Sequence, residues 1–260
     1  MATKPVFPEP FVFVPMQGRP QLLFVLLHGE SADPEQLLPL ADAIKRAFPQ
    51  SMVVLPYAFE PVNASQDPES AASENRQGYH WVDSSASDGG QYPERVARKL
   101  PALIRQIQQF QHQYGLSGQQ TALAGFSQGA SMALEACHAQ PDLAGRVLAF
   151  SGLYATPPTK LPPATMLHFF HGANDSQVSV DEVESTLVRL GELQADATLD
   201  VASRVGHELH QALIEQAIVR LQTCVPLRSW EAALSDLEAR AQDGAQEGGA
   251  GQAGQGRTLH

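Results

Sequence analysis

The chain has 260 residues, of which 43% are hydrophobic, and its formal net charge is −11 at pH 7. This length and apolar content suit one sizeable α/β domain. The excess of acidic residues argues against a nucleic-acid-binding surface and against attraction to an anionic membrane, and no apolar run reaches the ~18 residues that a spanning helix needs.

The first residues of the chain lack the apolar core and the small-residue cleavage site of a signal peptide. Only two cysteines occur, Cys137 and Cys224. Two buried, reduced thiols are a simpler interpretation of this pair than a disulfide or a metal site. These observations predict a cytoplasmic protein.

The N-terminal part of the chain alternates strands with a helix. Apolar runs predict three strands, at 11–14, 22–27 and 52–56. The run at 22–27 is continuous, as is typical of a strand covered on both faces of a sheet. After it, Asp33 is a good N-cap and Pro34 a good first residue for a helix whose apolar spacing continues to Phe48.

A polar, irregular segment extends from residue 58 to residue 92, and a long segment of this kind in a compact domain is usually functional or mobile. Beyond it, strands and helices alternate again. Helices are predicted at 93–114, 181–193 and 209–221, and strands at 146–152, 166–170 and 198–202. The alternation predicts a mostly parallel sheet with helices on both faces, whose functional sites lie beyond the carboxyl ends of the strands.

The domain boundary follows from a change in composition. Residues 1–225 fit a single α/β domain. Residues 226–243 could add one amphipathic helix, and residues 244–260, rich in Gly, Gln and Ala, are expected to form a disordered tail.

The most informative stretch is Gly125-Phe126-Ser127-Gln128-Gly129, which an apolar strand precedes and a helical sequence follows. G-x-S-x-G in this setting is typical of a nucleophile elbow, a tight turn that exposes the serine hydroxyl at the end of a sheet. Gly125 and Gly129 would remove side chains that otherwise collide where strand and helix approach. The pattern alone is weak, because Gly and Ser are common, so the interpretation depends on the partners of Ser127.

The first partner is an acid. A serine nucleophile needs a base, the base needs an acid, and the chain order with such an elbow is serine, acid, histidine. Asp175 follows a strand and a His-Gly turn. Its rivals, Asp181 and Glu182, open the next helix, where carboxylates merely complement the helix dipole. Asp175 is therefore the predicted acid.

The second partner is the base, for which nine histidines are available. His207 comes directly after the last predicted strand, and His210, one helical turn later, is the alternative. These two histidines are three residues apart and do not form the H-E-x-x-H motif of a zinc site, so we expect no metal. His207 is the predicted base.

An oxyanion hole requires two backbone N–H groups. One is predicted to be that of Gln128, just after the nucleophile, and the other that of Glu30, in the loop after His28-Gly29. A plain strand-to-helix turn is the alternative interpretation of His28-Gly29.

Four motifs together resemble the phospholipase/carboxylesterase family, which includes small bacterial carboxylesterases and acyl-protein thioesterases of the α/β-hydrolase fold. The motifs are Leu27-His28-Gly29, Gly125-Phe126-Ser127-Gln128-Gly129, His171-Gly172-Ala173-Asn174-Asp175 and Gly206-His207. The resemblance covers about residues 22–221. It implies a single-domain α/β-hydrolase without metal or organic cofactor, acting on a small-molecule ester. It also implies that Trp81 lines the acyl side of the pocket, with packing in the core as the alternative.

The sequence departs from the family pattern in three places. Glu30 stands where an apolar residue is usual, so a carboxylate comes close to the predicted oxyanion. Ser179 stands where the segment after the acid usually has a proline. The polar segment at 58–92 replaces the family's pocket loop, which leaves the substrate preference open.

The predicted activity is hydrolysis of carboxylic esters through an acyl-enzyme. A thioesterase or lysophospholipase using the same triad is the close alternative, and a non-catalytic binding protein on a hydrolase scaffold is a remote one. Because the segment at 58–92 offers few large apolar groups, and each buried methylene contributes about 0.8 kcal/mol, we expect a preference for acyl chains of up to about eight carbons.

Overall fold

The computed structural model describes residues 8–62, 78–83, 92–160 and 165–223. Residues Met1–Gln222 form one compact unit, and a second unit, Thr223–His260, lies almost wholly outside the described residues. The predicted helical extension at 226–243, the predicted tail at 244–260 and Cys224 therefore also lie outside them.

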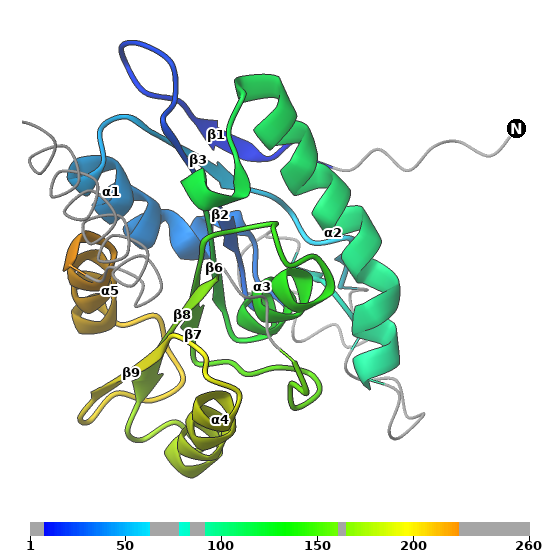
Figure 1. Ribbon diagram of the computed structural model, residues 1–260, viewed down its shortest axis with the longest axis vertical. Coiled ribbons are helices and arrows are strands. Elements are labelled where there is room, and N and C mark those ends of the chain that lie inside the picture. Colours follow the sequence, from blue (N-terminus) through cyan, green and yellow to red (C-terminus); the bar gives the residue numbers. More distant parts are fainter. Residues whose placement is uncertain (1–7, 63–77, 84–91, 161–164, 224–260) are drawn as a thin grey trace, which may run out of the picture. The chain divides into compact units, whose positions relative to one another are not determined.

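A twisted sheet forms the centre of the first unit (Figure 1). Its strands are β1 (Phe11–Phe13), β2 (Leu22–Leu27), β3 (Ser51–Leu55), β6 (Thr121–Phe126), β7 (Arg146–Phe150), β8 (Met166–Gly172) and β9 (Ala197–Ala202). In the described part of the chain they follow the order β1-β3-β2-β6-β7-β8-β9. Every neighbouring pair is parallel except β1 with β3, so the sheet is mostly parallel, as the alternation of strands and helices predicts.

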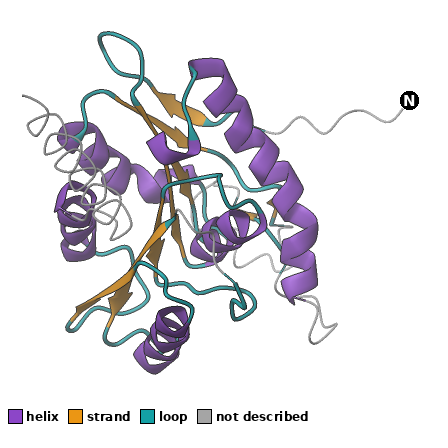
Figure 2. Cartoon of the chain, in the orientation of Figure 1, coloured by secondary structure: helices purple, strands orange, loops and turns teal. Residues whose placement is uncertain are grey.

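Helices cover both faces of the sheet (Figure 2). Within the described residues they are α1 (Leu38–Ala47), α2 (Tyr92–Tyr114), α3 (Gln128–Ala139), α4 (Val180–Glu192) and α5 (Gln211–Thr223), together with the short 3-10 helices η1 (Pro34–Leu37) and η3 (Gly118–Gln120). Buried side chains of α2, α3 and α4 belong to one hydrophobic cluster, and those of α1 and α5 belong to a second. The sheet separates the two clusters, which explains why its central strands are apolar on both faces.

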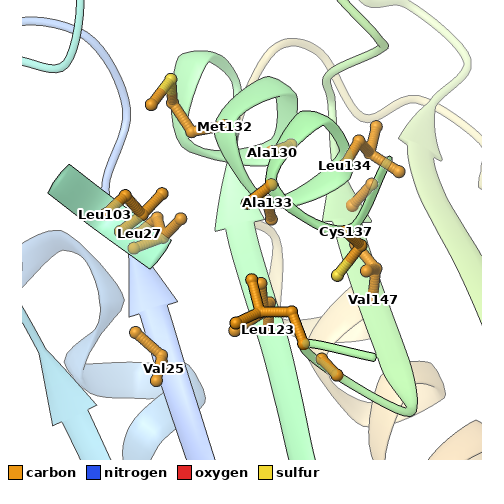
Figure 3. Close-up of a cluster of buried hydrophobic side chains, with 14 of the residues drawn as sticks. Val25, Leu27, Leu103, Leu123, Ala130, Met132, Ala133, Leu134, Cys137 and Val147 are labelled. Atoms are coloured by element: carbon orange, nitrogen blue, oxygen red, sulfur yellow. The ribbon is translucent and has the colours of Figure 1, made fainter. Parts of the chain in front are cut away.

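The helix α3 is the most buried of these helices. Its residues from Gln128 to Cys137 are all buried, and many of them are small. Figure 3 shows part of the surrounding cluster, in which Leu103 of α2 and Val147 of β7 belong to the same core as Ala133 and Cys137. A helix that is buried all round is held rigidly by packing, and its first residue follows the elbow serine directly.

The structure differs from the sequence-based expectation in two local features. The predicted helix after Asp33 begins as the 3-10 helix η1, with the Asp33 carboxylate accepting a hydrogen bond from the Glu35 N–H at 2.8 Å. The segment expected to be irregular contains two short antiparallel strands, β4 (Glu60–Pro61) and β5 (Tyr79–His80). Two-residue strands carry no periodicity that a sequence pattern could detect. None of the described helices is long and apolar enough to cross a bilayer.

Candidate active site

Ser127 lies between β6 and α3, at the carboxyl end of a central strand. Its backbone has φ 53° and ψ −117°, which is a strained conformation for a residue with a side chain. The Ser127 N–H donates to the Phe150 carbonyl at 2.8 Å, which fixes this turn to β7. A side chain at Gly125 would overlap the backbone of Gly129, and one at Gly129 would overlap the Leu27 carbonyl. The predicted reason for both glycines is therefore confirmed.

The structure brings Ser127, Asp175 and His207 together. His207 Nε2 lies 2.9 Å from Ser127 Oγ, and His207 Nδ1 lies 2.8 Å from Asp175 Oδ2. The serine is at the end of β6, the aspartate follows β8 and the histidine follows β9. Because parallel strands end at the same edge of a sheet, three residues far apart in sequence meet there.

The state of Asp175 determines which nitrogen of His207 carries the proton. Burial by itself raises the pKa of Asp175, but hydrogen bonds from the Val178 and Gln177 N–H groups and from His207 outweigh it, so the net pKa is lowered. An ionised carboxylate can only accept, so His207 Nδ1–H donates to it. The lone pair of Nε2 is then free to accept the proton of Ser127, as a general base requires.

His171 lies directly beside Asp175. Its Nε2 is 2.8 Å from the Val178 carbonyl and 3.5 Å from Asp175 Oδ2, and its side chain is almost fully buried. A carbonyl only accepts, so this nitrogen carries a hydrogen that also faces the carboxylate. The motifs alone do not predict this contact, although the place of His171 four residues before Asp175 is visible in the sequence.

Close packing holds the histidine loop against the aspartate loop. A side chain at Gly172 would overlap the carbonyl oxygens of Val205 and Gly206, the two residues before His207. The Asn174 N–H also donates to the Val205 carbonyl at 2.8 Å. His207 and Asp175 are therefore held in place by backbone contacts as well as by their own hydrogen bond.

The rival residues have other hydrogen-bonding partners. His210 Nδ1 accepts from the Ala212 N–H at 3.1 Å, at the start of α5. Glu182 forms a capping box with Ser179 at the start of α4, and Ser179 is the residue that replaces the family's usual proline. Ser179 thus caps α4 where the family usually has a proline, and the hydrogen bonds of Asp175 are present.

The loop after β2 carries the other predicted oxyanion donor. The Gly29 N–H is bound by Gln36 Oε1 at 2.7 Å, so Gly29 does not offer its amide to a ligand. Glu30, the next residue, is exposed at the turn. Across from it, Gln128 is the first residue of α3, where an N–H has no acceptor within the helix.

Trp81 is next to this loop, but its side chain is fully buried. The indole Nε1–H donates to the His28 carbonyl at 2.8 Å, and the ring packs edge-on against Phe59 at 5.5 Å between centroids. A pocket wall would present part of its surface to a ligand. The burial therefore favours the alternative that Trp81 packs in the core.

The described residues offer no cluster of three or more His, Cys, Asp or Glu side chains that could hold a metal ion. Cys137 is a free thiol in α3, and burial raises its pKa to about 12. At neutral pH such a thiol stays protonated and unreactive, and we regard it as a core residue.

Comparison with known proteins shows the family of this chain. Residues 9–225 match the phospholipase/carboxylesterase family. The chain belongs to this family. It is 31% identical to the esterase YpfH of Escherichia coli (strain K12) over 215 residues, which are 83% of this chain and 88% of that protein.

Solved structures agree with the family assignment. The crystal structure of esterase PE8 has 27% sequence identity and a TM-score of 0.72, covering 85% of this chain and 100% of that one. The Bacillus cereus carboxylesterase (18% identity, TM-score 0.63, covering 80% and 91%) and the Zea mays acyl-protein thioesterase 2 (15% identity, TM-score 0.63, covering 83% and 98%) share the fold. The chain is thus an α/β-hydrolase and a carboxylesterase-family enzyme, which removes the non-catalytic alternative.

Proposed function

We propose that Ser127, His207 and Asp175 are the catalytic triad of a carboxylesterase. Ser127 attacks the ester carbonyl while His207 takes its proton, and His207 then returns the proton to the leaving alcohol. Water repeats the sequence on the acyl-enzyme, and Asp175 holds His207 in the required tautomer throughout. The continuous hydrogen-bonded chain from Ser127 through His207 to Asp175 is the observation that carries the proposal.

The proposed oxyanion hole consists of the backbone N–H groups of Gln128 and Glu30. The first belongs to the N-terminus of α3, whose dipole also favours negative charge. The second belongs to the loop after β2. In that loop the Gly29 N–H already donates to Gln36 Oε1, which leaves the next amide, that of Glu30, as the proposed donor. The Glu30 carboxylate acts on Tyr92, where burial raises the hydroxyl's pKa and the charge of Glu30 adds to the rise. In this proposal Glu30 serves through its backbone N–H and not through its carboxylate.

The proposed substrates are small-molecule esters with short acyl chains. Trp81 is one of the few large aromatic groups that the segment at 58–92 offers for a long chain, and its side chain is fully buried. With less apolar surface to cover methylenes at about 0.8 kcal/mol each, long chains gain little affinity. Thioesters and lysophospholipids remain the alternative substrates, because the same triad can open either bond.

A panel of aryl esters and thioesters of increasing acyl length tests this proposal, with Ser127→Ala as the matched negative. We expect kcat/KM to be highest for short esters, and Ser127→Ala to lose about a million-fold in kcat while melting at the wild-type temperature. Substantial hydrolysis by Ser127→Ala would refute the triad. A wild-type optimum on palmitoyl thioesters would replace the short-chain esterase with an acyl-thioesterase.

We also propose that the enzyme needs no cofactor and acts in the cytoplasm. The triad chemistry proceeds with side chains and water alone. The buried thiol of Cys137 is compatible with a reducing compartment. Activity that survives exhaustive dialysis against a metal chelator would support the first part, and a fluorescent fusion would locate the protein.

A further inference from the structure

The side chain of Gln128 is buried and makes three hydrogen bonds to one short backbone segment. Its Oε1 accepts from the Trp81 N–H at 2.7 Å and from the Val82 N–H at 3.2 Å, and its Nε2 donates to the Val82 carbonyl at 2.8 Å. Only 5% of the Gln128 residue is exposed. The backbone N–H of Gln128 is a proposed oxyanion donor. Its side chain therefore links this donor to Trp81 and Val82, which are 47 and 46 positions away in the chain.

The segment that contains Trp81 and Val82 also forms hydrogen bonds with the loop that carries Glu30, the other proposed oxyanion donor. The Trp81 indole N–H donates to the His28 carbonyl at 2.8 Å, two residues before Glu30. The His28 ring is fully buried and accepts from the Ala58 N–H at 3.1 Å through Nε2, so its Nδ1–H donates to the Gly29 carbonyl at 2.7 Å. Burial lowers the pKa of His28, which agrees with this neutral ring.

A further backbone hydrogen bond joins this segment to the loop that carries Glu30. The Tyr79 N–H, in β5, donates to the Ala32 carbonyl at 2.8 Å, just beyond Glu30. The residues from Tyr79 to Val82 thus contact the oxyanion loop on both sides of Glu30 and contact the elbow at Gln128.

We propose that Gln128, Trp81, Val82 and His28 form a positioning clamp that sets the distance between the two oxyanion donors. We call these four residues the Gln128 clamp. The inference rests on the proposed function, and it assigns to the Gln128 side chain and the Trp81 indole a role in the transition state without contact with the substrate. Oxyanion stabilisation depends on donors fixed before reaction, at hydrogen-bond distance from the position the oxygen will occupy. The elbow between β6 and α3 fixes Ser127 and Gln128, but the other proposed donor, Glu30, belongs to the separate loop after β2.

The clamp also explains why Trp81 is buried. An indole that lined the acyl pocket would leave the His28 carbonyl without its donor. A buried carbonyl without a partner is unfavourable, so the loop that carries Glu30 would shift. The indole is therefore a positioning residue, and its aromatic surface packs against His28 and Phe59.

Two variants test the clamp and keep both backbone donors. Gln128→Met retains the length of the side chain but leaves the N–H groups of Trp81 and Val82 without their acceptor. Trp81→Phe removes the indole N–H together with the five-membered ring and keeps a six-membered aromatic ring at this buried site. Deleting an oxyanion donor outright lowers kcat about 10²–10³-fold, so displacing one should lower kcat about 10- to 100-fold, with KM nearly unchanged.

The readout is chosen to separate positioning from general destabilisation. Alongside kcat and KM on an aryl acetate, we would measure inhibition by a trifluoromethyl ketone, which adds to the serine and places an oxyanion in the hole. Its affinity should fall by about the same factor as kcat/KM, in the range of about 10- to 100-fold. Leu103→Ala is the matched control, since it opens a buried site in the core under α3 and should lower the melting temperature without changing kcat.

Three results would overturn the clamp. The first is folded Gln128→Met and Trp81→Phe proteins that both keep the wild-type kcat and inhibitor affinity. The second is a rise in KM with kcat unchanged in Trp81→Phe, which would make Trp81 a wall of the substrate pocket. The third is a loss of kcat in Leu103→Ala that matches the clamp variants. Failure of the proposed function has a different signature, because Ser127→Ala would then stay active.

Discussion

Replacing Asp175 by asparagine is the sharpest test of the site, because the structure dictates how the new amide must be oriented. Oδ1 of Asp175 accepts from the Gln177 N–H at 2.9 Å and the Val178 N–H at 3.0 Å. Two donors face this position, so in Asp175→Asn the amide oxygen must occupy it. The NH2 group is then left facing His207 Nδ1, where the carboxylate oxygen was.

This orientation reverses the tautomer of His207. A facing NH2 group donates, so Nδ1 must become the acceptor and the ring proton must move to Nε2. Nε2–H then points at Ser127 Oγ and cannot take its proton. A wrong tautomer of this kind lowers kcat about 10⁴-fold, which corresponds to about 5 kcal/mol of lost transition-state stabilisation.

The assay is hydrolysis of an aryl acetate at mildly alkaline pH, with a melting curve for each variant. Asp181→Asn and Glu182→Gln are the controls, because each removes a carboxylate charge near the start of α4 without touching His207. Both should keep the wild-type kcat. A folded Asp175→Asn protein with near-normal kcat, or a large loss of kcat in either control, would show that the acid is elsewhere.

Three further predictions concern other parts of the site and the core. His207→Ala should be nearly inactive and His210→Ala close to wild type in kcat, because His210 only accepts from a backbone N–H at the start of α5; the reverse result would move the base to His210. Gly172→Ala should lower both kcat and the melting temperature, since its new methyl group would displace the loop that precedes His207, and a variant with both values unchanged would contradict this packing. Burial, followed by the charges of two nearby arginines, lowers the pKa of His168 to about 4. Because the unfolded value is about 6.5, the unfolded chain binds the additional proton between these pH values. The free energy of unfolding should therefore fall as pH drops from about 6.5 to about 4, by on the order of 3 kcal/mol. In His168→Leu, the free energy of unfolding measured by urea denaturation should fall less over the same pH range.

The parts of the candidate site whose position could be predicted from the sequence are those that short motifs define. The glycines around Ser127 are required by backbone contacts within one turn, so their spacing is visible in five consecutive letters. Asp175 and His207 each follow the end of a strand, and the mostly parallel sheet brings such ends together. The bounds of β2 also match the predicted run at 22–27, because a strand buried on both faces is apolar at every position.

The parts that the sequence did not predict depend on contacts between distant segments. The strands β4 and β5 are two residues each and pair with one another across a polar segment. The contacts of the Gln128 side chain are of this kind, because only the fold brings Trp81 and Val82 to it. The role of Trp81 could not be read from composition either, since a tryptophan in a polar loop is compatible with a pocket wall and with a buried anchor.

The proposed triad and the proposed oxyanion donors depend on different parts of the fold, so substitutions in those parts should affect the enzyme differently. The proposed triad is placed by the sheet, whose strands are held by many backbone hydrogen bonds and by a core on each face. The proposed oxyanion donors depend in addition on a segment outside the large sheet, between β3 and α2. Changes to that segment would therefore act on kcat through its hydrogen bonds with Gln128 and His28, which belong to the Gln128 clamp.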